Sequence, residues 1–141
     1  MKVYESSEIR NVALIGHGNC GKTTLAAGML FASGATNRLT RVDEGNTVTD
    51  FDEDEIQRKI TIATACAYVE WRKNKVNLLD TPGFNIFIND TKAAMVVADA
   101  GLVVVDGVSG VEVQTEKVWS FCEDYNLPRA FVINKLDRER S

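Results

Sequence analysis

The pattern of hydrophobic and polar positions divides the chain into short apolar runs and longer amphipathic stretches. Short apolar runs bounded by turn residues are typical of buried strands, whereas apolar positions at helical spacing are typical of helices that cover a core. The pattern predicts strands at 11–15, 60–69, 76–80, 101–106 and 130–134, and helices at 23–33, 88–98 and 111–125.

The order of these elements predicts the fold class. Strands that alternate with helices are typical of an α/β fold, in which a mostly parallel sheet is covered on both faces in three layers. Only a short polar segment separates 60–69 from 76–80, which predicts one antiparallel hairpin strand. The polar segment 36–59 has no clear period, so we expect a long functional loop there, with a solvated acidic run at 52–55.

Composition and charge narrow the class of protein. The chain has 141 residues, 45% of them hydrophobic and 26% charged, which is enough for one compact domain. The net charge of -4 argues against a surface that holds nucleic acid by charge alone, and we expect no sequence-specific nucleic-acid contact. We expect no membrane contact, because no apolar stretch is long enough to span a bilayer. Three widely spaced cysteines predict reduced thiols, and we expect a cytoplasmic monomer.

The first motif is Gly-His-Gly-Asn-Cys-Gly-Lys-Thr at 16–23, between a predicted strand and a predicted helix. Its glycines permit a curled backbone whose N–H groups point at phosphate oxygens, and the following helix adds its positive end. The lysine of this motif can hold the β- and γ-phosphates, and the threonine after it can bind Mg²⁺. The motif predicts nucleoside triphosphate binding through Gly18, Asn19, Cys20, Gly21, Lys22, Thr23 and Thr24.

Two further motifs follow later strands. Asp80 begins Asp-Thr-Pro-Gly, and an acidic residue at a strand end supports Mg²⁺, while Gly83 can bring its N–H near a γ-phosphate. Asn134, Lys135 and Asp137 belong to Asn-Lys-Leu-Asp after the last strand. A carboxylate can accept from both N1–H and N2–H of guanine, a pair of donors that adenine lacks. The three motifs therefore predict GTP or GDP with Mg²⁺; the alternative is a phosphate-loop ATPase or nucleotide kinase.

These motifs, in this order, resemble the translational GTPases, and most of all elongation factor G and its paralogues, including the tetracycline-resistance ribosomal protection proteins. The resemblance covers essentially the whole chain and includes 18–25, 58–62, 80–84, 110–116 and 127–137. It implies a P-loop NTPase fold, GTP hydrolysis and the ribosome as partner. It also implies that 1–141 is a partial GTP-binding domain, truncated at its carboxyl-terminal end, of a longer multidomain protein. Such a protein would meet the ribosome mainly through domains that 1–141 does not include.

The resemblance also assigns roles and exposes departures. It implies that 36–59 is switch I, that Thr61 binds Mg²⁺ when GTP is bound, and that Lys22, Thr61 and Gly83 serve hydrolysis. Phe84 stands where elongation factor G usually has a histidine that helps position the attacking water, so we expect slow intrinsic hydrolysis. The alternative is a GTP-binding switch without ribosome-driven turnover. Asn19 replaces a common aspartate, and our hypothesis is that it binds K⁺; the alternative is a loop residue that binds no ion.

Overall fold

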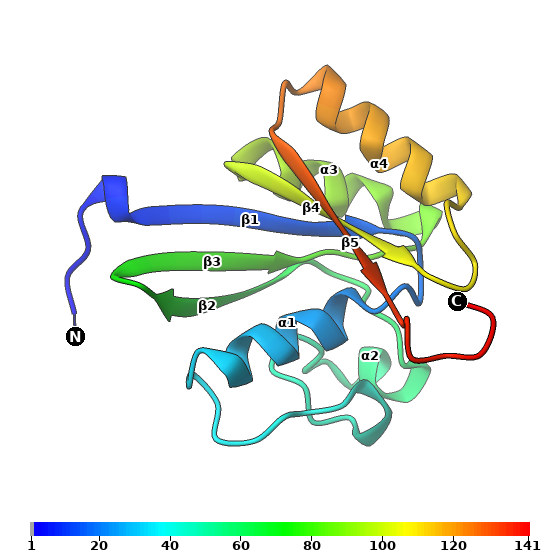
Figure 1. Cartoon of the computed structure of the whole chain (residues 1–141), viewed down its shortest axis with the longest axis horizontal. Coiled ribbons are helices and arrows are strands. Elements are labelled where there is room, and N and C mark those ends of the chain that lie inside the picture. Colours follow the sequence, from blue (N-terminus) through cyan, green and yellow to red (C-terminus); the bar gives the residue numbers. More distant parts are fainter. Residues whose placement is uncertain (1) are drawn as a thin grey trace.

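The computed structural model describes residues 2–141 and contains a five-stranded sheet in the order β2-β3-β1-β4-β5 (Figure 1). Its strands are β1 (Ile9–Gly16), β2 (Ala65–Trp71), β3 (Asn74–Asp80), β4 (Ala100–Asp106) and β5 (Arg129–Asn134). Its α-helices are α1 (Lys22–Ala32), α2 (Glu53–Arg58), α3 (Ile88–Val97) and α4 (Val113–Asp124). Short 3₁₀ turns are η1 (Ser6–Glu8), η2 (Val42–Glu44) and η3 (Asn85–Phe87).

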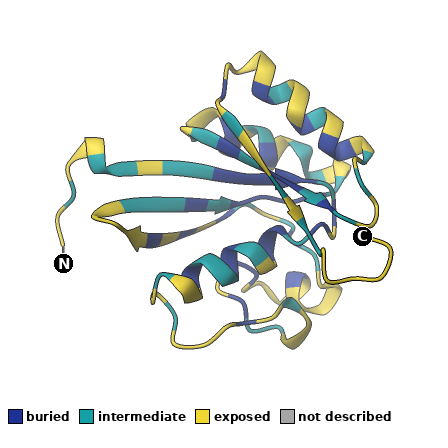
Figure 2. Cartoon of the chain, viewed as in Figure 1, coloured by how far each residue is buried: buried dark blue, intermediate teal, exposed yellow. Residues whose placement is uncertain are grey.

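The strand pairing confirms a mostly parallel sheet with one antiparallel hairpin strand. β1 lies at the centre and pairs in parallel with β3 on one side and with β4 on the other. β5 pairs in parallel with β4, and β2 pairs antiparallel with β3. The carboxyl-terminal half of β1 is fully buried (Figure 2), which explains its unbroken apolar run, since helices cover both faces of a parallel sheet.

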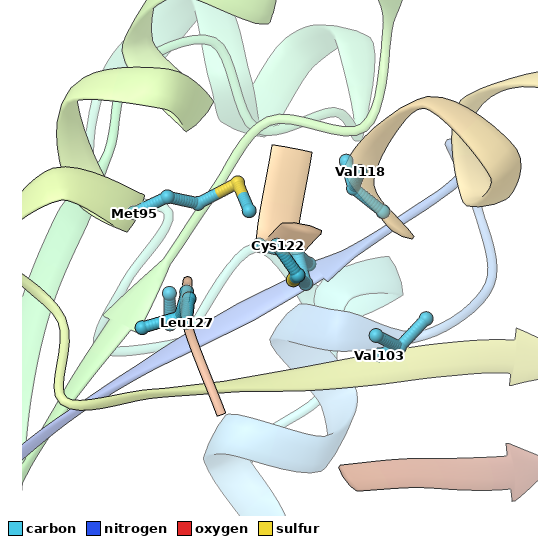
Figure 3. Close-up of a cluster of buried hydrophobic side chains, with 7 residues drawn as sticks. Met95, Val103, Val118, Cys122 and Leu127 are labelled. Atoms are coloured by element: carbon cyan, nitrogen blue, oxygen red, sulfur yellow. The ribbon is translucent and has the colours of Figure 1, made fainter. Parts of the chain in front are cut away.

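One face of the sheet is covered by α3 and α4, and a compact apolar cluster fills the space between them and the strands (Figure 3). Met95 of α3 and Val118 and Cys122 of α4 point toward Val103 of β4 and toward Leu127. Close packing of these side chains fixes both helices against the sheet. The helix predicted at 111–125 begins at Val113, after a turn that carries the chain away from β4.

The other face carries α1 and α2 (Figure 1). Leu30 of α1 packs with Leu78 of β3 and with Ala67 and Val69 of β2 in a second apolar cluster. The alternation predicted for β2 is confirmed in this part of the strand, because Ala67 and Val69 are buried and Tyr68 is exposed. Among the described residues, no helix is long and apolar enough to cross a membrane.

The predicted strand at 60–69 is too long, since β2 begins only at Ala65. The backbone N–H groups of Ile62 and Ala63 donate to the Glu55 carboxylate at 2.9 and 3.2 Å instead of joining the sheet. The prediction that the acidic run at 52–55 is solvated is wrong for Glu55, which is only 3% exposed. Glu55 is buried because its carboxylate satisfies these backbone donors inside the protein.

Candidate functional site

A cavity of about 350 Å³ opens at the end of the sheet where β1 and β3 finish. In a parallel sheet these carboxyl ends meet at one edge, which is where ligands bind in open α/β folds. The lining comes from the β1–α1 loop, from the segment between α1 and β2, and from the chain after β3 and β5: Gly18, Asn19, Gly21, Lys22, Thr23, Thr24, Val42, Asp43, Asp50, Lys59, Ile60, Thr61, Gly83, Phe84, Lys135 and Arg138.

The loop between β1 and α1 turns on two glycines with positive φ, Gly16 at 147° and Gly21 at 98°. A Cβ on Gly16 would lie 2.4 Å from the carbonyl oxygen of Val104, so a larger residue does not fit. α1 begins directly after Gly21, and no side chain caps its first N–H groups. Free N–H groups and the positive end of a helix are the features that suit a site to an anion.

Lys22 is 6% exposed, and its ammonium group donates to the carbonyl oxygens of Gly16 (3.2 Å) and His17 (2.9 Å). Gly83 lies against the same group, because a Cβ on Gly83 would be 2.4 Å from Lys22 Nζ and 2.6 Å from the backbone nitrogen of Gly18. Gly83, in the segment after β3, therefore lies beside both the Lys22 ammonium and the backbone N–H of Gly18. Gly83 and Lys22 meet here although they are far apart in the sequence.

Two threonine hydroxyls meet behind this point. Thr23 Oγ1 and Thr61 Oγ1 lie 3.0 Å apart, and Thr61 donates to Asp50 Oδ1 at 2.9 Å. All three side chains are buried. Burial raises the pKa of Asp50, and the hydrogen bond from Thr61 opposes this effect.

Asp80 ends β3 beside these hydroxyls and is completely buried. Its Oδ2 accepts from Thr49 at 2.8 Å, while its Oδ1 is buried with no hydrogen-bond partner. Burial is the main cause that raises the pKa of Asp80 to about 6. A buried carboxylate oxygen without a partner beside threonine hydroxyls fits a hard cation such as Mg²⁺, which prefers oxygen ligands.

Phe84 closes one side of the cavity. Its ring lies over Gly18, where a Cβ would come within 2.8 Å of the ring atom Cζ. Because a phenyl ring has no donor or acceptor, this position cannot hold a water molecule by a hydrogen bond.

The end of β5 and the residue that follows it contact the β1–α1 loop directly. Asn134 Nδ2 donates to the carbonyl oxygen of Cys20 at 2.9 Å, and Lys135 Nζ donates to that of Asn19 at 2.5 Å. The side chain of Lys135 lines the cavity, whereas Asp137 is exposed and is absent from the lining. The structure therefore joins two of the three predicted guanine-reading residues to the phosphate-binding loop and leaves the third in solvent.

Most of the predicted site residues meet at the cavity. Those in its lining are Gly18, Asn19, Gly21, Lys22, Thr23, Thr24, Thr61, Gly83 and Lys135. Cys20 and Asp80 lie buried behind the lining, and Asn134 supports it through Cys20. The sequence pattern does not single out Asp50, because one acidic residue in a polar loop looks like its neighbours. Its contact with Thr61 depends on how that loop folds.

Comparisons with known proteins show the family of this chain. The family model of the elongation factor Tu GTP-binding domain matches residues 7–141. The mitochondrial ribosome-releasing factor 2 of Culex quinquefasciatus is 45% identical over 131 residues, covering 93% of this chain and 18% of the relative. Its counterpart from Scheffersomyces stipitis is 44% identical over 129 residues, covering 92% of this chain and 15% of the relative. The chain thus spans less than a fifth of the length of these relatives.

Solved structures share the fold. A protein from Thermus thermophilus superposes with a TM-score of 0.92 at 40% identity, covering 96% of this chain and 21% of that protein. A bacterial selenocysteine-specific elongation factor has a TM-score of 0.75 at 24% identity over 91% of this chain and 20% of its own, which shows the fold alone. The phosphate-binding loop, the buried oxygen cluster and the family match lead to one conclusion: this chain belongs to the elongation factor Tu GTP-binding domain family.

Proposed function

We propose that this chain binds GTP with Mg²⁺ at the cavity and hydrolyses it as the GTP-binding part of an elongation factor G-like factor that acts on the ribosome. The observation that carries the proposal is the meeting of Lys22, the Thr23–Thr61 hydroxyl pair and the unpartnered oxygen of Asp80 at the end of the sheet. In a site for a metal-bound triphosphate, a lysine holds the phosphates, while hydroxyl and carboxylate groups hold the metal.

Each residue has a chemical task in this proposal. Lys22 leaves its loop carbonyls to hold the β- and γ-phosphates, and the Gly18 and Gly83 N–H groups donate to phosphate oxygens. Thr23 and Thr61 would hold Mg²⁺ directly, with Asp50 and Asp80 around them. Mg²⁺ neutralises charge that develops on the phosphate oxygens during phosphoryl transfer.

Guanine recognition is assigned to the segment after β5. Lys135 already lines the cavity, and Asn134 fixes this segment to the β1–α1 loop. Asp137 lies in the exposed stretch that follows, so it must turn toward the base when nucleotide binds. Titration of the protein with GDP and ADP, each with Mg²⁺ and again with EDTA, tests this assignment. Comparable affinity for the two nucleotides would exclude guanine recognition.

A second candidate function is a GTP-binding switch that hydrolyses GTP slowly and acts through its GTP-bound state. The position of Phe84 favours this function. The Phe84 ring lies on Gly18, where the usual histidine would help place a water molecule. Phosphate release from GTP with and without ribosomes distinguishes the two functions, because a pure binding module shows no stimulation.

We also propose that K⁺ binds at Asn19 and offsets the missing histidine by neutralising charge near the phosphates. Asn19 is exposed and lines the cavity, which places it next to the proposed nucleotide site. Equal hydrolysis rates in KCl and NaCl would count against this site. The cytoplasmic location stays a prediction, since the fungal and insect relatives are named as mitochondrial.

A further inference from the structure

Asp106, at the last position of β4, contacts the candidate guanine loop from behind. β4 and β5 point toward the same end of the sheet (Figure 1), and their register places Asp106 opposite Asn134. One step further, Lys135 turns back with a φ of 60°, and its ammonium group lies 2.5 Å from Asp106 Oδ2. The pair is shielded from solvent, since the side chains of Lys135 and Asp106 are 17% and 9% exposed.

The Asp106 carboxylate is fixed at both of its oxygens. Oδ1 accepts from the backbone N–H groups of Val108 at 2.9 Å and Ser109 at 3.3 Å, while Oδ2 accepts from Lys135. The Lys135 ammonium, followed by the Val108 N–H, lowers the pKa of Asp106 to about 2. The carboxylate therefore carries its charge at neutral pH and cannot rotate away from Lys135 without losing hydrogen bonds.

Lys135 in turn joins three segments. Its ammonium donates to Asp106 and to the carbonyl oxygen of Asn19 in the β1–α1 loop, and the residue lines the cavity. A free lysine side chain populates many rotamers. Fixing the ammonium between β4 and the loop removes most of that freedom before any ligand arrives, which favours binding by preorganisation.

We propose that Asp106 is a positioning residue for the nucleotide base: it holds the Lys135 ammonium against the phosphate-binding loop so that the lysine stem forms a preformed surface for the base. This inference rests on the proposed guanine binding at the same site. Asp106 touches no ligand itself, and its effect on affinity runs entirely through Lys135.

The substitution Asp106→Asn tests the role with little change in shape. Asparagine keeps one oxygen for the N–H groups of Val108 and Ser109, but it places an amide NH₂ where Lys135 needs an acceptor. Lys135→Met keeps an apolar stem and removes the ammonium. We expect each variant to release fluorescently labelled GDP about 10-fold faster than the unaltered protein, the size expected for one charge-assisted hydrogen bond.

The double variant gives the decisive result. If Asp106 acts through Lys135, Asp106→Asn in the Lys135→Met background produces no further acceleration of GDP release. If the double variant releases GDP faster than Lys135→Met, so that the two accelerations multiply, the proposal is overturned. GDP release from Lys135→Met at the unaltered rate would also overturn it, and that result does not depend on how Asp106→Asn folds. Inorganic pyrophosphate is the second probe, and we expect its affinity to change less than about 2-fold, since it has no base. An equal loss of GDP and pyrophosphate affinity would overturn a role in positioning the base.

A control and a separate outcome complete the test. Glu123→Gln removes the carboxylate of the Arg129–Glu123 pair, which is 2.9 Å long and lies away from the cavity, and we expect unchanged GDP release. If the unaltered protein binds GDP and ADP equally, the proposed guanine recognition fails, and this inference fails with it. If the protein prefers GDP to ADP but the accelerations of GDP release by the two substitutions multiply, only the role of Asp106 is overturned.

Discussion

The hydroxyl oxygens of Thr23 and Thr61 lie 3.0 Å apart, although 38 residues separate them in the chain. Thr23 is at the start of α1, and Thr61 lies in the irregular stretch before β2. Their meeting folds the segment between them over the cavity, so that Asp50 and Thr49 reach the same cluster. A metal ion that binds both hydroxyls would thereby link the phosphate-binding loop to this segment.

Replacing Thr61 by alanine removes one of the two hydroxyls and leaves the other in place. Mg²⁺ should then increase GTP affinity about 10-fold less than in the unaltered protein, because one strong polar contact is lost. We expect GDP affinity to change little. Titrations with a GTP analogue and with GDP, with and without Mg²⁺, measure both. Thr36→Ala is the control, because the Thr36 hydroxyl donates to the carbonyl oxygen of Arg38 in an exposed loop outside the cavity. Unchanged Mg²⁺ dependence in Thr61→Ala would exclude Thr61 as a ligand.

Asp80 predicts a stability that depends on pH when nucleotide and Mg²⁺ are absent. Its pKa is about 6 in the folded protein against 3.8 for the unperturbed group, so the folded state binds more protons between these values. The contribution of Asp80 to stability therefore falls as pH rises through this window. Asp80→Asn stays neutral, and we expect it to be more stable than the unaltered protein by about 3 kcal/mol at pH 7.5 and equal to it near pH 3.5.

Thermal unfolding in EDTA at several pH values measures this difference. The same variant is expected to lose most of the stabilisation that Mg²⁺ with GDP produces, because Asp80 supplies the unpartnered oxygen. Asp124→Asn, at the exposed end of α4, serves as the control for loss of one carboxylate. A stability difference for Asp80→Asn that does not vary with pH would contradict the explanation.

Phe84→His restores a hydrogen-bonding side chain at the position that lies over Gly18. We expect phosphate release from GTP to accelerate by about 10-fold or more, toward the range that a positioned acid–base group contributes. Single-turnover assays with and without ribosomes are the measurement. Phe131→His, on exposed β5, makes the same chemical change outside the cavity. An unaltered rate for Phe84→His would mean that Phe84 does not limit hydrolysis.

Lys59 ends α2 with a φ of 56°, the left-handed conformation that favours glycine. Lys59→Gly relieves this conformational cost, and we expect a gain in the free energy of unfolding of about 0.5–1 kcal/mol. Urea unfolding measures the gain. Lys59→Ala removes the same exposed ion pair with Asp43 but keeps a Cβ, so it should give no gain. Equal stability of the glycine and alanine variants would show that the backbone conformation is not the cause.

The sequence by itself determined the order of the strands and of α1, α3 and α4, the parallel sheet with its one hairpin strand, and the position of the glycine-rich β1–α1 loop, because each depends on local hydrophobic pattern and local turn residues. It did not predict α2, which lies inside the polar segment predicted as a loop. It placed Lys22 and Thr23 by their spacing from the glycines. Only the tertiary structure decided that Glu55 is buried, that Asp50 holds Thr61, and that Asp106 holds Lys135. These contacts depend on how separate segments fold against one another, and a single sequence carries no periodic signal for a polar side chain whose partner lies in another segment.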